Sequence, residues 1–542
     1  MTTEDIAHAL KLTAQLMELH GDNPFKVKSL SNAAYRLDKT GIDLAGKSLE
    51  ELEQIEGIGK GIAQKIIELE QHGVTKELQA LLDKTPAGVI EMLGVKGIGP
   101  KKVAQLWKEL EVESVGELLY ACHENRLVDL KGFGTKTQEQ VRKAIEFNMG
   151  AKGKFHYATA EATAQRLVEF LKAQCKTELV SLAGAVRRKC EIVESIEAVV
   201  AFEGDISLDD FENHHRVPVG ITQCTAGEFY TALLTHSASP EHLEQLETAH
   251  IAIPANAKSE EAGFAEMKLQ YIEPELREGR GEILLAQQNK IPQLVEMTDL
   301  RGILHNHSTW SDGMHTLQEM AEHCKKLDYD YLGICDHSQS AFYANGLKAD
   351  RVAAQQEEID ALNKKLAPFR IFKGIESDIL HDGSLDYPEE ILKTFDFIVG
   401  SVHSGLKMDK EKATTRLLRA IENPYTTILG HPTGRLLLSR EGYPVDHKKI
   451  IDACAANQVI IELNAHPYRL DIDWRWIPYC LEKGVQISIN PDAHEKDGLL
   501  DMYYGVCVAR KGMLTKDMCF NALSGEEISK YFTGIKKKKG LS

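Results

Sequence analysis

The sequence lacks the features of a disulfide-bonded or membrane-spanning protein. Its ten cysteines are scattered singly and none forms a Cys-x-x-Cys pair, which argues against a disulfide framework and against a thiolate zinc site. No apolar run approaches the roughly 20 residues that cross a bilayer, and the first residues lack a basic segment followed by an apolar one. We therefore expect no membrane association, no secretion and a reducing cytoplasmic location.

Basic residues are also scarce. Lys and Arg number 64 against 81 Asp and Glu, which gives a formal charge of −17. This balance excludes a broadly basic surface but not DNA binding, because a few backbone amides and lysines can hold a phosphate backbone. The length of 542 residues exceeds what one hydrophobic core supports and predicts several domains.

One short motif occurs three times within the first 150 residues, as IEGIGK at 55–60, VKGIGP at 95–100 and LKGFGT at 130–135. Each copy places an apolar residue between two glycines and precedes an amphipathic helical stretch. Such a turn exposes backbone amides and the following helix adds the positive end of its dipole, so the motif can hold a phosphate without reading a base. A structural helical bundle or a protein-interaction module is the alternative. The expected DNA contacts are Gly57, Gly59, Lys60, Gly97, Gly99, Lys101, Lys102, Gly132, Gly134 and Lys136.

From about Leu300 the chain alternates short apolar strands with amphipathic helices, seven times in all. This alternation predicts a parallel sheet closed or nearly closed into a barrel, with reactive groups at the C-terminal ends of the strands. The strand ends supply nine candidate ligands, and two pairs of them have the i, i+2 spacing that directs both side chains to one face of a strand. The candidates are His305, His307, Asp312, His337, Glu376, His403, His431, Asp492 and His494.

Nine nitrogen and oxygen ligands are too many for one ion, since zinc usually takes four and manganese about six. They suit two or three divalent ions, which together activate water and neutralise the charge of a phosphate. The set therefore predicts hydrolysis of phosphoesters. The alternative, isolated histidines that only make hydrogen bonds, requires nine separate coincidences at matching strand ends.

The segments HNHSTWSDG, CDHS, GIESDIL, GSVHSG, GHPTGR and NPDAH resemble the successive motifs of the PHP (polymerase and histidinol phosphatase) superfamily. That resemblance implies a distorted (β/α)7 barrel whose nine ligands hold a trinuclear centre of zinc, manganese or iron. Asn464 and Arg469 match a segment that lines the substrate face in that family. Arg469 is thus a candidate phosphate contact, with a structural salt bridge to Asp471 or Asp473 as the alternative.

The first half of the chain and slightly more, to about residue 296, resembles family X DNA polymerases. GDNPFKVKSLSNAAYRL followed by IEGIGKGIAQKI is similar to their small N-terminal domain, and Lys65 falls where some members carry a Schiff-base lysine. A phosphate-contacting or merely solvated lysine is the alternative there. In the polymerase-like middle region the first two catalytic aspartates become Ser195 and Glu197, and the third aligns with Gly220. One carboxylate cannot organise two magnesium ions, so we expect polymerase activity to be absent or residual.

The resemblance extends from about residue 4 to about residue 535, in the order of bacterial family X polymerases that carry a PHP domain. It implies a helix-hairpin-helix domain at 1–80, a second, fingers-like one at 81–150, a degenerate α+β nucleotidyltransferase palm and thumb at 151–296 and a PHP phosphoesterase barrel at 297–542.

The expected function is that of a bacterial, nucleoid-associated DNA repair enzyme using Mn²⁺, Zn²⁺ or Fe²⁺. It would shorten 3′ ends of gapped, nicked or 3′-ended duplex, with abasic-site cleavage and 3′-phosphate removal as further activities. An active gap-filling polymerase, a non-catalytic DNA-binding scaffold and a small-molecule phosphatase are the alternatives.

Overall fold

The computed structural model describes the chain except residues 41, 129, 151–152 and 542, and it consists of two compact units. The first unit comprises residues 1–122 and 126–146, and the second comprises residues 123–125 and 147–542. The domain boundary expected between residues 150 and 151 adjoins residues 151–152, which lie outside the described residues. Among the residues described, no helix has both the length and the apolar character needed to cross a bilayer.

The N-terminal part of the chain is helical and packs around an apolar core. Helix α1 begins at a capping box in which Thr2 and Asp5 exchange side-chain and backbone hydrogen bonds. Its apolar face buries Leu10 and Leu16 against α2. The helices are α1 (Thr3–Leu19), α2 (Pro24–Thr40), α3 (Leu49–Glu53), α4 (Lys60–His72), α5 (Lys76–Asp83), α6 (Ala87–Met92), α7 (Pro100–Leu110), α8 (Val115–His123) and α9 (Thr135–Gly150).

The middle of the chain has the expected α+β character. Strands β2 (Val180–Ala183), β4 (Ile196–Ala201) and β5 (Val219–Cys224) form a mixed sheet in which β4 is central. Strands β1 (Phe155–His156) and β3 (Ile192–Val193) form a separate antiparallel pair. The helices of this region are α10 (Tyr157–Cys175), α11 (Gly184–Arg187), α12 (Phe229–His236), α13 (Pro240–Thr248), α14 (Glu260–Glu266) and α15 (Glu282–Gln287).

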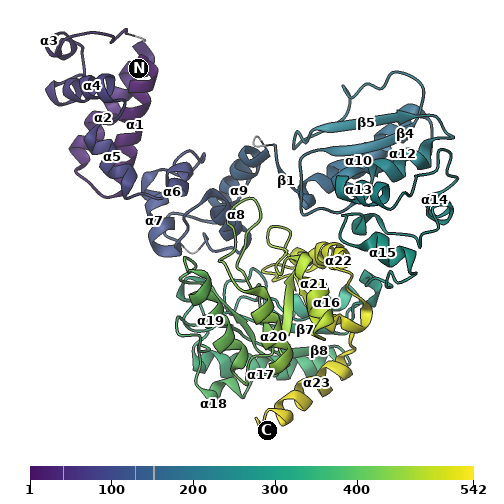
Figure 1. The fold of residues 1–542 in the computed structure, drawn as a ribbon. Coiled ribbons are helices and arrows are strands. Elements are labelled where there is room, and N and C mark those ends of the chain that lie inside the picture. The colour runs from purple at the N-terminus through teal and green to yellow at the C-terminus, as the bar shows by residue number, and fades with distance from the viewer. Residues whose placement is uncertain (41, 129, 151–152, 542) are drawn as a thin grey trace. The chain divides into compact units, whose positions relative to one another are not determined.

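The C-terminal part is a distorted parallel barrel with helices outside its short strands (Figure 1). Strands β6 to β8 form one parallel sheet and β9 to β13 form another. Isolated parallel bridges, His337 to Glu376 and Asn306 to Ala493, join the two sheets on both sides. The predicted barrel is therefore confirmed, closed by single bridges rather than by full ladders.

The strands of the barrel are β6 (Gly302–Ile303), β7 (Tyr331–Ile334), β8 (Arg370–Lys373), β9 (Glu376–Asp378), β10 (Val399–Ser401), β11 (Ile428–Leu429), β12 (Ile460–Asn464) and β13 (Ile487–Asn490). Its helices are α16 (Leu317–Lys326), α17 (Ala349–Leu366), α18 (Glu389–Leu392), α19 (Lys410–Glu422), α20 (His447–Asn457), α21 (Ile477–Glu482), α22 (Met502–Lys511) and α23 (Gly525–Lys538).

One predicted strand differs from the structure. The segment RIFKGIE was expected to be continuous but divides into β8 and β9 around Gly374. The backbone passes so close to β7 there that a Cβ on Gly374 would lie 2.6 Å from the carbonyl oxygen of Ile334. Only glycine permits this approach, and the break places Glu376 opposite His337.

The middle region and the barrel belong to one unit because polar contacts join them. Lys511 at the end of α22 is buried, and its Nζ donates to Glu278 at 2.7 Å and to the carbonyl of Arg188 at 2.8 Å. Arg510 pairs with Glu275. Buried charges of this kind are tolerated only when paired and hydrogen-bonded, so these contacts depend on both regions being folded.

We expect acid to weaken this junction through His156. Its Nε2 donates to the carbonyl oxygen of Leu437 at 3.0 Å, and burial lowers the pKa of His156 from 6.5 to about 4. As pH falls, His156 is therefore protonated at a higher pH in the unfolded chain than in the folded one. The free energy of unfolding drops between pH 6.5 and 4, by about 2 kcal/mol at pH 5. In His156→Gln the fall in melting temperature between pH 7.5 and 5 should be smaller than in the wild type; parallel profiles would contradict the assignment.

Candidate metal centre

The structure brings all nine strand-end candidates together at the C-terminal ends of the barrel strands. Their ligand atoms form three overlapping groups, each lying within 4.8 Å, and His431 joins them through Nε2, 2.9 Å from Oε1 of Glu376. The groups are His307, Asp312, His337 and His494; His305, His307, Glu376 and Asp492; and His337, Glu376 and His403. Three groups with shared members have the arrangement of a site for several ions.

Glu376 is the centre of this arrangement. Its two carboxylate oxygens face five imidazoles, at 2.9 Å from His431, 3.0 Å from His337 and 3.2 Å from His403. The Nε2 atoms of His305 and His307 lie at 3.4 and 3.6 Å. A carboxylate with so many imidazole neighbours is suited to coordinate a metal ion.

The electrostatics favour the metal-binding form at some of the ligand candidates and not at others. Although burial lowers both values, the carboxylates of Glu376 and Asp378 raise the pKa of His403 to about 10, and those of Asp312 and Asp492 raise the pKa of His494 to about 9. Burial alone would raise the pKa of Glu376, but the imidazoles of His403 and His305 hold it well below its usual range. Burial, together with His494 and His337, lowers the pKa of His307 to about 3. At neutral pH the central carboxylate is therefore ionised and His307 is neutral, the states that coordinate cations.

Unsatisfied buried atoms test whether the cluster fits a metal. Buried polar atoms in proteins almost always have hydrogen-bond partners. Here, within the described residues, buried ligand atoms without a hydrogen-bond partner are concentrated in the cluster: His305 Nε2, His307 Nδ1, Asp312 Oδ2, both ring nitrogens of His337, Glu376 Oε2, His431 Nδ1 and His494 Nε2. Burying so many polar atoms without partners costs free energy, and bound cations would remove that cost. The donor set therefore fits divalent ions.

Two carboxylates that the sequence analysis did not select support the ligands from behind. Glu462 on β12 is fully buried; its Oε2 accepts from Nδ1 of His305 at 2.7 Å, and its Oε1 accepts from the backbone amide of His431 at 3.0 Å. Asp378 on β9 accepts from Nδ1 of His403. Each contact leaves the other ring nitrogen to face the cluster, which is how outer carboxylates orient metal-binding histidines.

We expect Glu462→Gln to weaken metal binding about 10- to 100-fold, because a neutral amide no longer orients and polarises His305. Titration of the metal-free protein with Mn²⁺ or Zn²⁺ by calorimetry measures the change. Glu482→Gln, in which the replaced side chain is exposed, is the matched control. Equal affinities for the two variants would show that Glu462 serves packing alone.

Arg469 and Asn464 lie at the edge of the cluster. The Nδ2 of Asn464 donates to Oδ2 of Asp492 at 3.1 Å. Arg469 is 4% exposed. The pKa of His431 is lowered mainly by burial and secondly by the positive charge of Arg469. The guanidinium of Arg469 lies 4.0 Å from the carboxylate of Glu124, whereas Asp473, one of the expected partners, pairs with Arg435 and Arg475.

In the N-terminal unit the three Gly-apolar-Gly turns share one backbone conformation. The first glycine of each is left-handed, with φ of +89° at Gly57, +101° at Gly97 and +86° at Gly132. The second glycines, Gly59 and Gly99, are the N-caps of α4 and α7 and provide no capping side chain. The first-turn amides of these two helices are thus not capped from the N-cap position, as an anion site at a helix start requires.

The lysines around these turns differ. Lys60, Lys101 and Lys136 are exposed, whereas Lys102 is half-buried with its Nζ 4.8 Å from the ring centre of Phe133. Lys65 on α4 is half-buried and forms an ion pair with Glu77. An internal carboxylate partner for Lys65 was not anticipated from the sequence, and it differs from both the solvated and the phosphate-bound state.

The three positions of the polymerase carboxylates are adjacent in the structure. Glu197 on β4 pairs in register with Gly220 on β5, and the hydroxyl of Ser195 donates to Oε1 of Glu197 at 3.3 Å. Glu194, which precedes Ser195 in the sequence, has its carboxylate 3.8 Å from Nζ of Lys154. Of the three aligned positions, Glu197 alone supplies a carboxylate.

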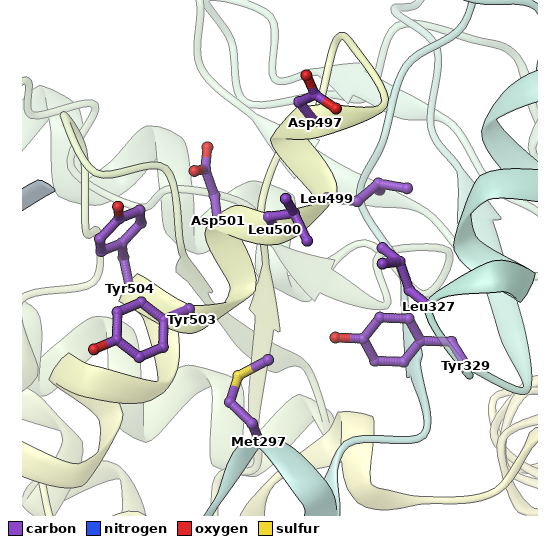
Figure 2. A pocket seen from close by; sticks show the side chains of 9 residues that line it. All are labelled: Met297, Leu327, Tyr329, Asp497, Leu499, Leu500, Asp501, Tyr503 and Tyr504. Carbon is purple, nitrogen blue, oxygen red and sulfur yellow. The ribbon is translucent and has the colours of Figure 1, made fainter. Parts of the chain in front are cut away.

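A separate hollow of about 580 Å³ lies beside the start of α22. Figure 2 shows the rings of Tyr503 and Tyr329 on either side of Met297, with Asp497 and Asp501 above them. It contains none of the nine ligand candidates. Two carboxylates and no cationic side chain in its lining make it unsuited to a phosphate.

Known domain families match successive parts of the chain, the hairpin turns first and the barrel last. Residues 1–75 match a helix-hairpin-helix domain, residues 89–146 a SAM-like helix-hairpin-helix tandem and residues 304–466 the PHP domain. The DNA polymerase/3'-5' exonuclease PolX of Bacillus subtilis is 33% identical over 98% of this chain and 99% of its own length.

Two further matches cover smaller shares of the chain. A probable phosphatase of Acetivibrio thermocellus is 27% identical over 43% of this chain and 95% of its own length. A histidinol phosphate phosphatase from Lactococcus lactis, solved with zinc, L-histidinol and phosphate, covers 39% of this chain and 93% of its own at 15% identity, with a TM-score of 0.32.

Proposed function

Since the chain belongs to the PolX family of DNA polymerase/3'-5' exonucleases, we propose that it is a metal-dependent DNA phosphodiesterase of DNA repair that removes nucleotides from 3′ ends. The observation that carries the proposal is the convergence of nine ligand candidates, eight of them buried, with Glu376 at their centre. The four expected domains, at 1–80, 81–150, 151–296 and 297–542, are part of the proposal.

The cluster would hold two or three ions of Mn²⁺ or Zn²⁺, with Fe²⁺ as a further candidate. Bound there, such ions supply an activated water and neutralise the charge of the phosphodiester. Glu376 would bridge, the imidazoles and Asp312 and Asp492 would complete the coordination, and Glu462 would keep His305 in the metal-binding tautomer. Arg469, buried near His431, would bind a non-bridging phosphate oxygen.

The hairpins would hold the DNA. Their uncapped helix starts and exposed lysines bind phosphates without reading bases, which suits an enzyme that acts on gaps, nicks and 3′ ends of any sequence. Cleavage at abasic sites and removal of 3′-phosphates use the same phosphoester chemistry and belong to the proposal as further activities.

The middle region would serve as a structural and DNA-binding element without nucleotidyl transfer. Two-metal nucleotidyl transfer needs several carboxylates, and Glu197 has Ser195 and Gly220 beside it. The contact of buried Lys511 with Glu278 joins this region to the barrel, so the region would stabilise the barrel even without nucleotidyl transfer.

A single assay separates the alternatives. The protein is incubated with Mn²⁺ and a 5′-labelled gapped duplex, with and without dNTPs, beside His305→Ala and the exposed control His214→Ala. Shortening that is lost only in His305→Ala supports the nuclease. Extension that depends on Glu197 would support an active polymerase, and binding without any change in length would support a scaffold.

Binding itself should depend on the hairpin lysines. We expect Lys60→Ala combined with Lys101→Ala to weaken binding to duplexes of any sequence and to reduce the slope of log affinity against log salt by about 2, since each lysine releases about one counterion. Lys11→Ala with Lys84→Ala, also exposed but outside the hairpins, is the control. Fluorescence anisotropy at several salt concentrations measures the slopes; identical slopes would place the DNA elsewhere.

A further inference from the structure

An exposed aromatic ring stands on the loop that follows the second barrel strand. Phe342 is 79% exposed, although the neighbouring Ala344 is buried. It lies in the short 3₁₀ helix η3 (Phe342–Ala344), between the ligand His337 and α17. A single exposed apolar side chain is ordinary by itself, so what matters is how this loop is held.

The loop is fixed to the metal cluster at both ends. At its base, the amide of Leu347 donates to the carbonyl of His337 at 2.8 Å. On one side, Ser340 Oγ donates to Oδ2 of Asp378 at 2.7 Å, the carboxylate that orients His403. On the other side, Nδ2 of Asn345 donates to the carbonyl of Ser311, next to Asp312, at 3.4 Å. The position of Phe342 is therefore tied to that of the ligands.

Aromatic rings connect Phe342 with the cluster. The ring centre of Tyr343 lies 6.3 Å from that of His337, and the ring centre of Phe342 lies 5.9 Å from that of Tyr343. The exposed ring is thus about two ring spacings from a ligand. When a phosphodiester occupies the cluster, the nucleobase beside it is displaced from the ligand candidates by one sugar, and an aromatic ring on the adjoining loop is placed to stack on it.

We propose that Phe342 is the stacking platform for the nucleobase next to the scissile phosphate. The proposal rests on the proposed function, because it assumes that the cluster takes a DNA phosphodiester. An aromatic face accepts any base, so the platform does not select a sequence.

A thermodynamic cycle tests the platform. Rates of 3′ shortening are compared for two labelled single strands, one with a normal 3′-terminal nucleotide and one whose terminal nucleotide lacks the base. We expect Phe342→Ala to lower kcat/KM about tenfold on the normal strand and to leave the strand without a base unchanged. Phe342→Trp should preserve the preference for the normal strand. Leu284→Ala, which removes a side chain of 59% exposure on α15, should leave both rates unchanged.

A second measurement does not depend on turnover. A strand with 5-iodouracil at its 3′ end and a phosphorothioate in its last linkage is bound in Ca²⁺ and irradiated, and the cross-linked peptide is identified by mass spectrometry. Cross-linking to the peptide that contains Phe342, lost in Phe342→Ala, supports the platform even where no shortening is seen. Cross-linking elsewhere, or a base preference that Phe342→Ala retains, overturns it. Absence of shortening by the wild type would overturn the proposed function alone.

Discussion

Glu376→Gln is expected to lower phosphodiester hydrolysis roughly 100-fold or more, the largest loss from any single conservative change in the chain. Loss of a residue that only supports a ligand lowers metal affinity or activity about 10- to 100-fold. Glu376 lies within 3.6 Å of five imidazole nitrogens at the centre of the cluster, so its loss should have a larger effect. Glutamine has almost the same shape, so packing is preserved. What changes is the charge and the second oxygen, both of which bridging requires.

The measurement combines rate and metal content. Hydrolysis of a small phosphodiester, which needs neither hairpins nor Phe342, isolates the metal centre from DNA binding. Bound metal per chain, measured by mass spectrometry after desalting, should fall in Glu376→Gln and not in the exposed control Glu482→Gln. Full metal content together with full activity would rule out a bridging role for Glu376.

The convergence of several ligand candidates could be predicted because the period of a strand is fixed. His305 and His307 are two residues apart, and in an extended chain this spacing directs both side chains to the same side. Asp492 and His494 have the same spacing, but they lie beyond the end of β13 and Asp492 is left-handed, with φ of +55°, so the strand period alone does not explain why they converge. The order of the strands then followed from parallel connectivity. The barrel was therefore accessible from local patterns without knowledge of any tertiary contact.

The supporting carboxylates had weaker signals. Asp378 is two residues after Glu376, so the spacing rule that found the ligand pairs would have found it as well. Glu462 is a charged residue inside a run of buried aliphatic residues on β12, which signals a paired charge but does not name the partner. That partner, His305, is 157 positions away in sequence.

Other features depended on tertiary contacts that no local pattern contains. The division of the third predicted strand reflects the close approach of Gly374 to β7. The ion pair of Lys65 with Glu77 joins α4 to α5 across a turn. The exposure of Phe342 also could not be predicted, because an aromatic residue in a loop can be buried or exposed and the sequence FYA does not indicate which.

Removal of metal is expected to destabilise the barrel by a large and measurable amount. Without cations the cluster buries ionised carboxylates and several ring nitrogens that have no hydrogen-bond partner among the described residues. An ion present at a thousand times its dissociation constant stabilises the folded state by about 4 kcal/mol. For a unit of this size that corresponds to a rise of about 5 °C in melting temperature for each ion.

Differential scanning calorimetry of the full chain, with chelator and with Mn²⁺ or Zn²⁺, measures this shift. The transition of the second unit should move, whereas that of the helical first unit, which contains none of the nine ligands, should stay where it is. In Glu376→Gln the shift should shrink, because fewer ions bind. A melting temperature that is the same with chelator and with metal would mean that the buried cluster is stable by itself, and the argument from its unsatisfied atoms would fail with it.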